Sequence, residues 1–416
     1  MIKDLEEIKF ELKKYGQEHL LNNYENLDEN KKKTLVNQLS NIDYELINNL
    51  YANTKKAGKD SKDVIEPIEY LDKFKLNGQY KTYETLGKNA IKEGKLAVVT
   101  MAGGQGTRLG HKGPKGTYDI GLDSHKSLFE LLADGIKEEA KKYDVTVPWF
   151  IMTSRENNQE TVEFFEKNKC FGYQKDKNLF FFKQGELPMI DTEGKILIDE
   201  NGLVKEAADG HGGIYEALVK NDMTKKMKEL GVEWVFIGGV DNCLVKMVDP
   251  VLMGIAIDKK VSVAGKSLVK ANPHEKVGVF CKKNGRPYVI EYSEITDEMA
   301  EAVDENGELL YGESHILCNL FSVDSIERMG AKPLPYHSAY KKAKYIDKNG
   351  NLVEPTSPNA YKFEAFLFDA FGEVDNMAVL RVKREEEFAP VKNSDDAGVD
   401  CPSTAKALYE NFYKLK

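Results

Sequence analysis

A loop dense in glycine directly follows a strongly apolar run, and this pairing constrains the fold more than any other feature of the chain. The run LAVVTMA, residues 96–102, is uncharged and β-branched, as expected of a buried strand in a parallel sheet. The following segment, GGQGTRLGHKGPKG, has six glycines between Gly103 and Gly116. Main-chain amides in such a loop can converge on an oxyanion because no Cβ stands in the way. The sequence therefore predicts an α/β protein that binds phosphate after this strand.

Two common phosphate-binding motifs do not fit the loop. A Walker A loop needs a second glycine five residues after its first, and other residues stand at that distance from Gly103, Gly104 and Gly106. A dinucleotide-binding motif would need a glycine where Leu109 stands. Arg108 and Lys115 add positive charge suited to a polyphosphate. The alternative, a flexible turn, is disfavoured because turns rarely need so many glycines together with an arginine and a Pro-Lys pair.

The pattern of apolar residues divides the chain into regions. Helical spacing runs through the first ninety residues, strands and helices alternate from residue 96 to about 260, and hairpins follow, with Asn284-Gly285 as a favoured turn. The alternation predicts βαβ crossovers and a parallel sheet covered on both faces. We predict helices near 127–141, 159–168, 213–230 and 250–259, and strands near 145–154, 178–184 and 234–242. We expect a helical N-terminal region at 1–92, a central α/β domain at 93–376 and a small C-terminal domain at 377–416.

Composition excludes several classes of protein. The chain has 59 basic and 68 acidic residues, so a general affinity for nucleic acid or an anionic membrane is not expected. Its five cysteines are scattered and form no CxxC, which predicts reduced core thiols rather than a disulfide framework or a zinc site. The charged N-terminus and the absence of long apolar runs predict a cytoplasmic protein without membrane spans. No oligomeric state follows from the sequence.

Asp241 is a candidate metal ligand. It follows an apolar run in the segment GGVDN, and open α/β sheets place their ligands beyond the carboxyl ends of strands. A carboxylate there suits Mg²⁺ carried by a nucleotide. An Asx turn that ends the strand is the alternative.

Several segments together carry a resemblance to a known family. GGQGTRLG followed by PKG resembles the signature of uridylyltransferases, and the continuation is similar to eukaryotic-type UDP-N-acetylglucosamine pyrophosphorylases. The similarity continues through WFIMTS, KQGELPMI, VDNCLVKMVDP, VIEYSEI, FEAFLFD and EEFAPVKN. It implies a Rossmann-like nucleotidyltransferase core with a mixed central sheet, flanked by smaller N- and C-terminal domains. The implied reaction converts UTP and a hexose 1-phosphate, of N-acetylglucosamine, glucose or galactose, into a UDP-sugar and pyrophosphate.

The resemblance also assigns nucleotide-binding residues. Ala102, Gly103 and Gly104 match positions that contact the nucleotide. Gln184 and Gly210 match the pair that reads uracil, in which the amide meets the pyrimidine edge and the glycine permits close approach.

The charged residues are expected to act by neutralising phosphate. Arg108 and Lys115 would bind the leaving pyrophosphate, and Asp241 would hold Mg²⁺. Lys362 and Lys392 match family lysines that contact the transferred phosphate or the sugar phosphate, although most lysines in any chain are simply solvated. No protein nucleophile or general base is expected, because the attacking phosphate is already ionised.

Four residues match sugar-binding positions. Gly278 and Glu291 agree with the family, with Glu291 accepting from sugar hydroxyls; an exposed strand residue is the alternative for Glu291. His211 and His315 replace asparagines of the N-acetylglucosamine enzymes. A neutral imidazole has only one donor and one acceptor on a bulkier ring, so we expect 2-hydroxyl sugars to be used at least as well as the N-acetylated one. A core histidine is the alternative for His315.

Two non-catalytic functions remain as alternatives: a nucleotide-sugar sensor, and a scaffold that uses the helical N-terminal region as a partner surface. The retained charged positions, Arg108 and Lys115 among them, disfavour the sensor, and a scaffold would show nucleotide binding without turnover.

Overall fold

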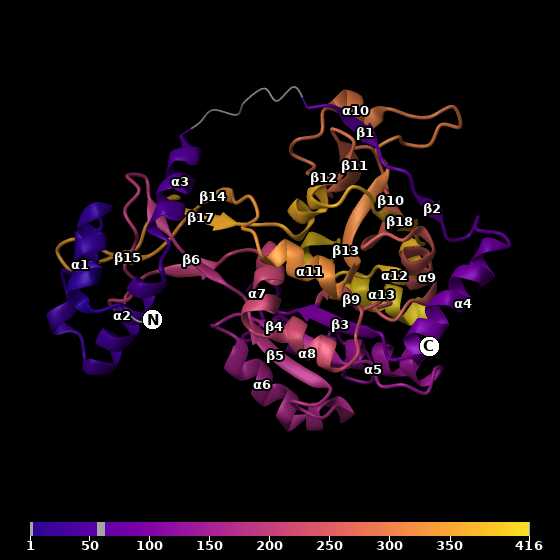
Figure 1. Ribbon diagram of the computed structural model, residues 1–416, viewed down its shortest axis with the longest axis horizontal. Helices are drawn as coiled ribbons and strands as arrows, with labels where there is room; N and C mark the ends of the chain where they lie inside the picture. The colour runs from indigo at the N-terminus through magenta and orange to yellow at the C-terminus, as the bar shows by residue number, and fades with distance from the viewer. Residues whose placement is uncertain (1–2, 56–62, 416) are drawn as a thin grey trace. The chain divides into compact units, whose positions relative to one another are not determined.

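The computed structural model describes residues 3–55 and 63–415, which form two compact units (Figure 1). Unit 1 comprises Met1–Lys62, Gly185–Gly213 and Leu334–Phe366, and unit 2 comprises Asp63–Gln184, Ile214–Pro333 and Leu367–Lys416. These units cut the chain differently from the expected boundaries at residues 92 and 376. The reason is that residues 63–92 and 377–415 supply strands and helices to unit 2.

In the described part of unit 2, eleven strands form one mixed sheet. The strands are β1 (Ile65–Pro67), β2 (Leu71–Asp72), β3 (Leu96–Met101), β4 (Trp149–Thr153), β5 (Leu179–Lys183), β9 (Trp234–Gly239), β10 (Val263–Val269), β11 (Val279–Lys283), β12 (Arg286–Ile290), β13 (Glu313–Ser322) and β18 (Ala378–Arg381). The main order is β2-β18-β10-β13-β9-β3-β4-β5. β9, β3, β4 and β5 are parallel, whereas β13 is antiparallel to β10, β9 and β11. The predicted α/β fold with a mixed central sheet is confirmed.

The helices of unit 2 largely follow the sequence pattern. They are α4 (Gln79–Lys92), α5 (Leu128–Lys141), α6 (Asn158–Lys167), α7 (Ile214–Lys220), α8 (Met223–Glu229), α9 (Pro250–Lys259), α10 (Asp297–Glu301), α11 (Val323–Gly330), α12 (Arg384–Glu387) and α13 (Pro402–Tyr413). α9 begins as predicted, because the Asp249 side chain accepts from the N–H groups of Val251 and Leu252. The helix predicted over 213–230 is two helices, since Asp222 between them has a φ of 57°.

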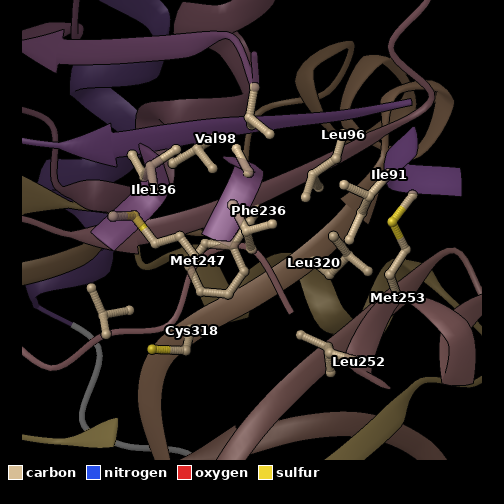
Figure 2. Close-up of a cluster of buried hydrophobic side chains, with 14 of the residues drawn as sticks. Ile91, Leu96, Val98, Ile136, Phe236, Met247, Leu252, Met253, Cys318 and Leu320 are labelled. Atoms are coloured by element: carbon tan, nitrogen blue, oxygen red, sulfur yellow. The ribbon is translucent and has the colours of Figure 1, made fainter. Parts of the chain in front are cut away.

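Apolar side chains from the strands of the sheet and from the helices packed on it form the core of unit 2. Figure 2 shows Val98 of β3, Phe236 of β9 and Leu320 of β13 together with Ile91 of α4 and Leu252 of α9. Alternate residues of the same strands are also buried, and Tyr215 of α7 packs edge-on against Phe321. Helices therefore cover both faces of the sheet, as predicted.

Two glycines allow α4 and α9 to touch backbone to backbone. A Cβ added at Gly87 would lie 1.8 Å from the Pro250 oxygen, and one at Gly254 would lie 1.8 Å from the Tyr83 oxygen. No side chain larger than hydrogen fits at either position without moving a helix.

Unit 1 combines N-terminal helices with strands from two later segments. Its helices are α1 (Leu5–Lys14), α2 (Glu29–Asn41) and α3 (Tyr44–Thr54), and its strands are β6 (Glu186–Pro188), β7 (Ile190–Asp191), β8 (Glu206–Ala208), β14 (His337–Lys341), β15 (Tyr345–Ile346), β16 (Leu352–Val353) and β17 (Ala360–Glu364). The apolar faces of the helices, with Leu12 and Leu39 fully buried, pack against Ile196, Val204 and Phe363. The expected N-terminal helices are thus present, and the core that they form is completed by residues from two later segments.

Two further sequence expectations concern chemistry and membranes. The five cysteines carry free thiols, and burial raises the pKa of Cys243, Cys281 and Cys318 to about 12. Over residues 3–55 and 63–415, every helix is too short or too polar to cross a membrane.

Candidate active site

The glycine loop after β3 is an ordered turn held by its own backbone. The N–H of Gly106 donates to the Gly113 oxygen at 3.0 Å, and the N–H of Lys115 donates to the Gly104 oxygen at 3.1 Å. Gly113 has a φ of 121°, which side-chain-bearing residues rarely adopt. Arg108 lies exposed in the short 3₁₀ helix Thr107–Leu109 at the tip. The loop is therefore shaped in advance, which disfavours its alternative interpretation as a flexible turn.

Asn157, which the sequence analysis missed, anchors the start of this loop. Its buried amide donates to the Ala102 oxygen at 2.8 Å and to the Gly104 oxygen at 3.3 Å. Its Oδ1 accepts from the Ser154 N–H at 2.9 Å. The turn that precedes α6 thus fixes the two carbonyls that begin the glycine loop. In the sequence this asparagine looks like an ordinary helix cap.

Gln184 lies against the glycine loop. It directly follows β5, and its N–H donates to the Thr153 oxygen of β4 at 2.8 Å. A Cβ added at Gly103 would lie 2.5 Å from the Gln184 Oε1. The two residues predicted to contact the nucleotide from β3 and β5 are therefore brought together at the carboxyl edge of the sheet.

Lys115 and Asp241 also meet at this edge. The Lys115 Nζ is 3.7 Å from the Asp241 Oδ2, and the side chains are 16% and 27% exposed. Asp241 follows β9, and β9 is the parallel neighbour of β3. Within the described residues, no three His, Cys, Asp or Glu side chains gather as a metal cage. A single accessible carboxylate beside an ammonium group fits Mg²⁺ that arrives with a nucleotide, since such ions keep few protein ligands.

Lys392 is carried to the same edge by a distant segment. The N–H of Val391 donates to the main-chain oxygen of Asp241 at 2.8 Å, so Lys392, the next residue in the chain, is held close to Asp241. The Lys392 side chain is 46% exposed, and its Nζ lies 3.8 Å from the Asp400 Oδ2. That contact is long enough to leave the ammonium group available for a phosphate.

The three predicted sugar-binding residues of unit 2 form a second group. A Cβ at Gly278 would lie 3.3 Å from the Glu291 Oε1, and the N–H of His315 donates to the Gly278 oxygen at 2.9 Å. The His315 ring is buried, lies 3.1 Å from the Asn319 amide, and meets three phenylalanine rings edge-on: Phe280, Phe368 and Phe371. This surrounding is typical of a core histidine, the alternative raised by the sequence.

Unit 1 holds the remaining predicted residues. Gly210 has a φ of 87°, and a Cβ there would lie 2.3 Å from the Ala365 oxygen, so only glycine fits. The His211 ring lies 5.4 Å from the Phe366 ring, which stacks on His337 at 4.7 Å. Lys362 on β17 pairs with Glu364, with 2.7 Å between Nζ and Oε1. The structure therefore divides the predicted site residues between the two units.

Comparison with known proteins decides the family. The sequence model of UTP–glucose-1-phosphate uridylyltransferase matches residues 43–411. The chain belongs to the UTP–glucose-1-phosphate uridylyltransferase family. This confirms the membership that the glycine loop and the later segments predicted.

Relatives in this uridylyltransferase family are similar over nearly the whole chain. The UDP-N-acetylglucosamine pyrophosphorylase of Saccharomyces cerevisiae is 36% identical, over 95% of this chain and 87% of its own. The UDP-N-acetylglucosamine diphosphorylase 2 of Arabidopsis thaliana is 36% identical, over 95% and 82%. The crystal structure of the Trypanosoma brucei UDP-N-acetylglucosamine pyrophosphorylase has a TM-score of 0.83 at 31% identity, covering 98% of this chain and 84% of that one. A Trypanosoma brucei UDP-glucose phosphorylase, at 18% identity and a TM-score of 0.65 with 90% and 76% covered, shares the fold.

Proposed function

We propose that this protein is a UTP:sugar-1-phosphate uridylyltransferase, which converts UTP and a hexose 1-phosphate into a UDP-sugar and pyrophosphate. The observation that carries the proposal is the Lys115–Asp241 pair, 3.7 Å apart, beside a pre-shaped glycine loop. A cation for phosphate oxygens and a carboxylate for a nucleotide-borne metal ion meet there at one sheet edge. Family membership supports the same reaction.

The chemistry follows from the charges at this edge. An ionised oxygen of the sugar phosphate attacks the α-phosphorus of UTP in line, and the bond from that phosphorus to the bridging oxygen of pyrophosphate breaks. The leaving pyrophosphate takes the bonding electrons, so Arg108 and Lys115 act by neutralising its growing charge. At this edge Gln184 orients the uracil and Lys392 holds a reacting phosphate, and the resemblance to the family gives Lys362 of unit 1 a phosphate-binding role as well. No side chain has to remove a proton.

Asp241 is the residue that would hold Mg²⁺. When bound, the ion would supply charge neutralisation on the UTP phosphates. We expect activity to be lost with a chelator and restored by Mg²⁺, and we expect Asp241→Asn to raise the Mg²⁺ concentration needed for half-maximal rate. Normal turnover of the chelated wild type would refute the metal assignment.

The reaction is tested by pyrophosphate release from UTP with a panel of sugar 1-phosphates. Wild type should release pyrophosphate with at least one sugar, and Lys115→Ala should be slowed by about 100-fold or more, which is typical of losing one electrostatic stabiliser. UTP binding without turnover on any sugar phosphate would instead support the sensor or scaffold alternative.

The choice of sugar is the finer part of the proposal. We expect glucose or galactose 1-phosphate to reach at least the kcat/KM of N-acetylglucosamine 1-phosphate, because His211 and His315 stand where N-acetylglucosamine enzymes have asparagine. His211→Asn should shift selectivity toward the N-acetylated sugar. His315→Asn separates two roles. If the His315 ring faces the sugar, the substitution should shift selectivity toward the N-acetylated substrate; if the ring belongs to the core, the substitution should lower only the melting temperature. A strong wild-type preference for the N-acetylated substrate would refute this expectation.

We also propose a cytoplasmic location. The five free thiols support it, since reducing compartments keep cysteines unpaired. Fractionation of the native cells, with activity in the soluble reducing compartment, would test it.

A further inference from the structure

Asn242 joins two segments that are far apart in the sequence. Its side chain is 5% exposed; Nδ2 donates to the Glu387 oxygen at 2.8 Å, and Oδ1 accepts from the Ala389 N–H at 2.8 Å. Oδ1 also accepts from the Leu244 N–H at 3.2 Å. One amide thus satisfies three backbone groups and clamps the stretch 387–389 beside the end of β9.

Backbone contacts extend this clamp as far as Lys392. Asn242 and Pro390 form a β-bridge, and the Val391 N–H donates to the Asp241 oxygen at 2.8 Å. Ala389 and Val391 are fully buried, whereas Lys392 is the first largely exposed side chain after them. The direction in which Lys392 leaves the protein is therefore set by the clamped residues that precede it.

A buried cluster of four charges fixes the other end of the clamped stretch. Glu387 is 1% exposed, and its carboxylate pairs with Lys266 at 2.5 Å and with Lys73 at 3.2 Å. Asp249 pairs with the same two ammonium groups, at 2.8 and 3.2 Å. Burial opposes the charge on Lys266, yet Asp249 and Glu387 raise its pKa. Two cations and two anions balance, so Glu387 is held without a net buried charge.

We propose that Asn242 is a positioning residue for Lys392, which it holds in register with Asp241. The inference rests on the function proposed above, in which Lys392 contacts a reacting phosphate and Asp241 a metal ion. The amide binds the backbone of residues 387 and 389, so it sets where the Lys392 side chain leaves the protein relative to Asp241 at the end of β9. A displacement of about 1 Å at a reacting group can cost about 100-fold in rate.

A double-mutant cycle tests this role. We would compare wild type, Asn242→Ala, Lys392→Ala and the double variant by kcat, by KM for UTP and by melting temperature. Asn242→Ala should lower kcat by about 10- to 100-fold and leave KM for UTP within about threefold. The double variant should turn over no more slowly than Lys392→Ala, because the amide acts only through that lysine. Asn242→Ser, which can keep one of the three hydrogen bonds, should recover part of kcat and serves if the alanine variant does not fold.

Gln17 offers a matched control in unit 1. Its side chain is 3% exposed, donates to the Gly194 oxygen at 2.9 Å and accepts from the Ile196 N–H at 3.0 Å. Gln17→Ala removes a comparable clamp, so it should lower the melting temperature while its effect on kcat stays below threefold.

The outcomes separate the inference from the function beneath it. Normal kcat in Lys392→Ala would refute the role proposed for that lysine, and the inference with it. If Lys392→Ala lowers kcat strongly and the double variant loses kcat by the product of the two single losses, only the positioning role of Asn242 is refuted. Unchanged kcat in folded Asn242→Ala would do the same.

Discussion

Replacing Gly103 with alanine should weaken UTP binding by a predictable amount. The new Cβ would lie 2.5 Å from the Gln184 Oε1, and ordinary contact begins at 3.4 Å, so the amide must retreat by about 0.9 Å. A hydrogen bond of about 2.9 Å to uracil would lengthen to about 3.8 Å, beyond a useful length. Losing it and leaving a polar group unpaired costs about 1–3 kcal/mol, which corresponds to an increase in KM for UTP of about 5- to 150-fold.

The turnover number should change less than KM, because the uracil contact is made equally before and during the reaction. Steady-state kinetics with varied UTP measure both quantities, and circular dichroism and the melting temperature check the fold. Gly135→Ala in α5 is the control, since a Cβ there meets nothing within 4 Å. A folded Gly103→Ala enzyme with KM for UTP within twofold of wild type would show that Gln184 does not read the base.

Three further predictions follow from single positions. Arg108→Ala should lower kcat by about 100-fold or more with an unchanged melting temperature, because the side chain is exposed and acts on charge; near-normal kcat would remove it from the mechanism. Gly254→Ala should destabilise the fold by about 1–3 kcal/mol or more in urea unfolding, because its Cβ would overlap the Tyr83 oxygen; an unchanged midpoint would contradict the close helix crossing. Burial alone would raise the pKa of Asp249, but Lys266 and Lys73 lower that pKa below its usual range, so the ionised carboxylate stabilises the fold above about pH 4 and this stabilisation is lost as the pH falls further. The difference in free energy of unfolding between wild type and Asp249→Asn should therefore shrink in acid. A difference that stays constant with pH would contradict the pairing.

Local features of the fold were predictable because their causes are local. The Asn284-Gly285 turn has φ values of 52° and 78°, which that residue pair favours, and α9 begins at its Asp-Pro signal. The glycine loop was singled out from its composition alone. Asp241 was singled out because it comes just after an apolar run that becomes β9, whereas Gln184 was assigned only by resemblance to the family.

Features that depend on distant contacts were not predictable. β18 lies inside the large sheet, between β2 and β10, although its sequence suggested a separate C-terminal domain. Asn157 and Asn242 are buried clamps, yet an asparagine that satisfies a distant backbone has the same local sequence as one on the surface. The environment of His315 depends on Phe368 and Phe371, more than fifty residues later in the sequence.

The order in which the pieces of unit 1 appear in the chain affects how the protein can be made. The chain passes between the two units five times, and the helices α1, α2 and α3 leave the ribosome long before their partners Ile196, Val204 and Phe363. Until then the parts of their apolar faces that pack on these later residues stay uncovered, which makes the nascent chain prone to aggregation and dependent on chaperones. For the same reason, deleting residues 3–55 would remove part of a shared core, because Ile196 and Phe363 would lose side chains that pack against them.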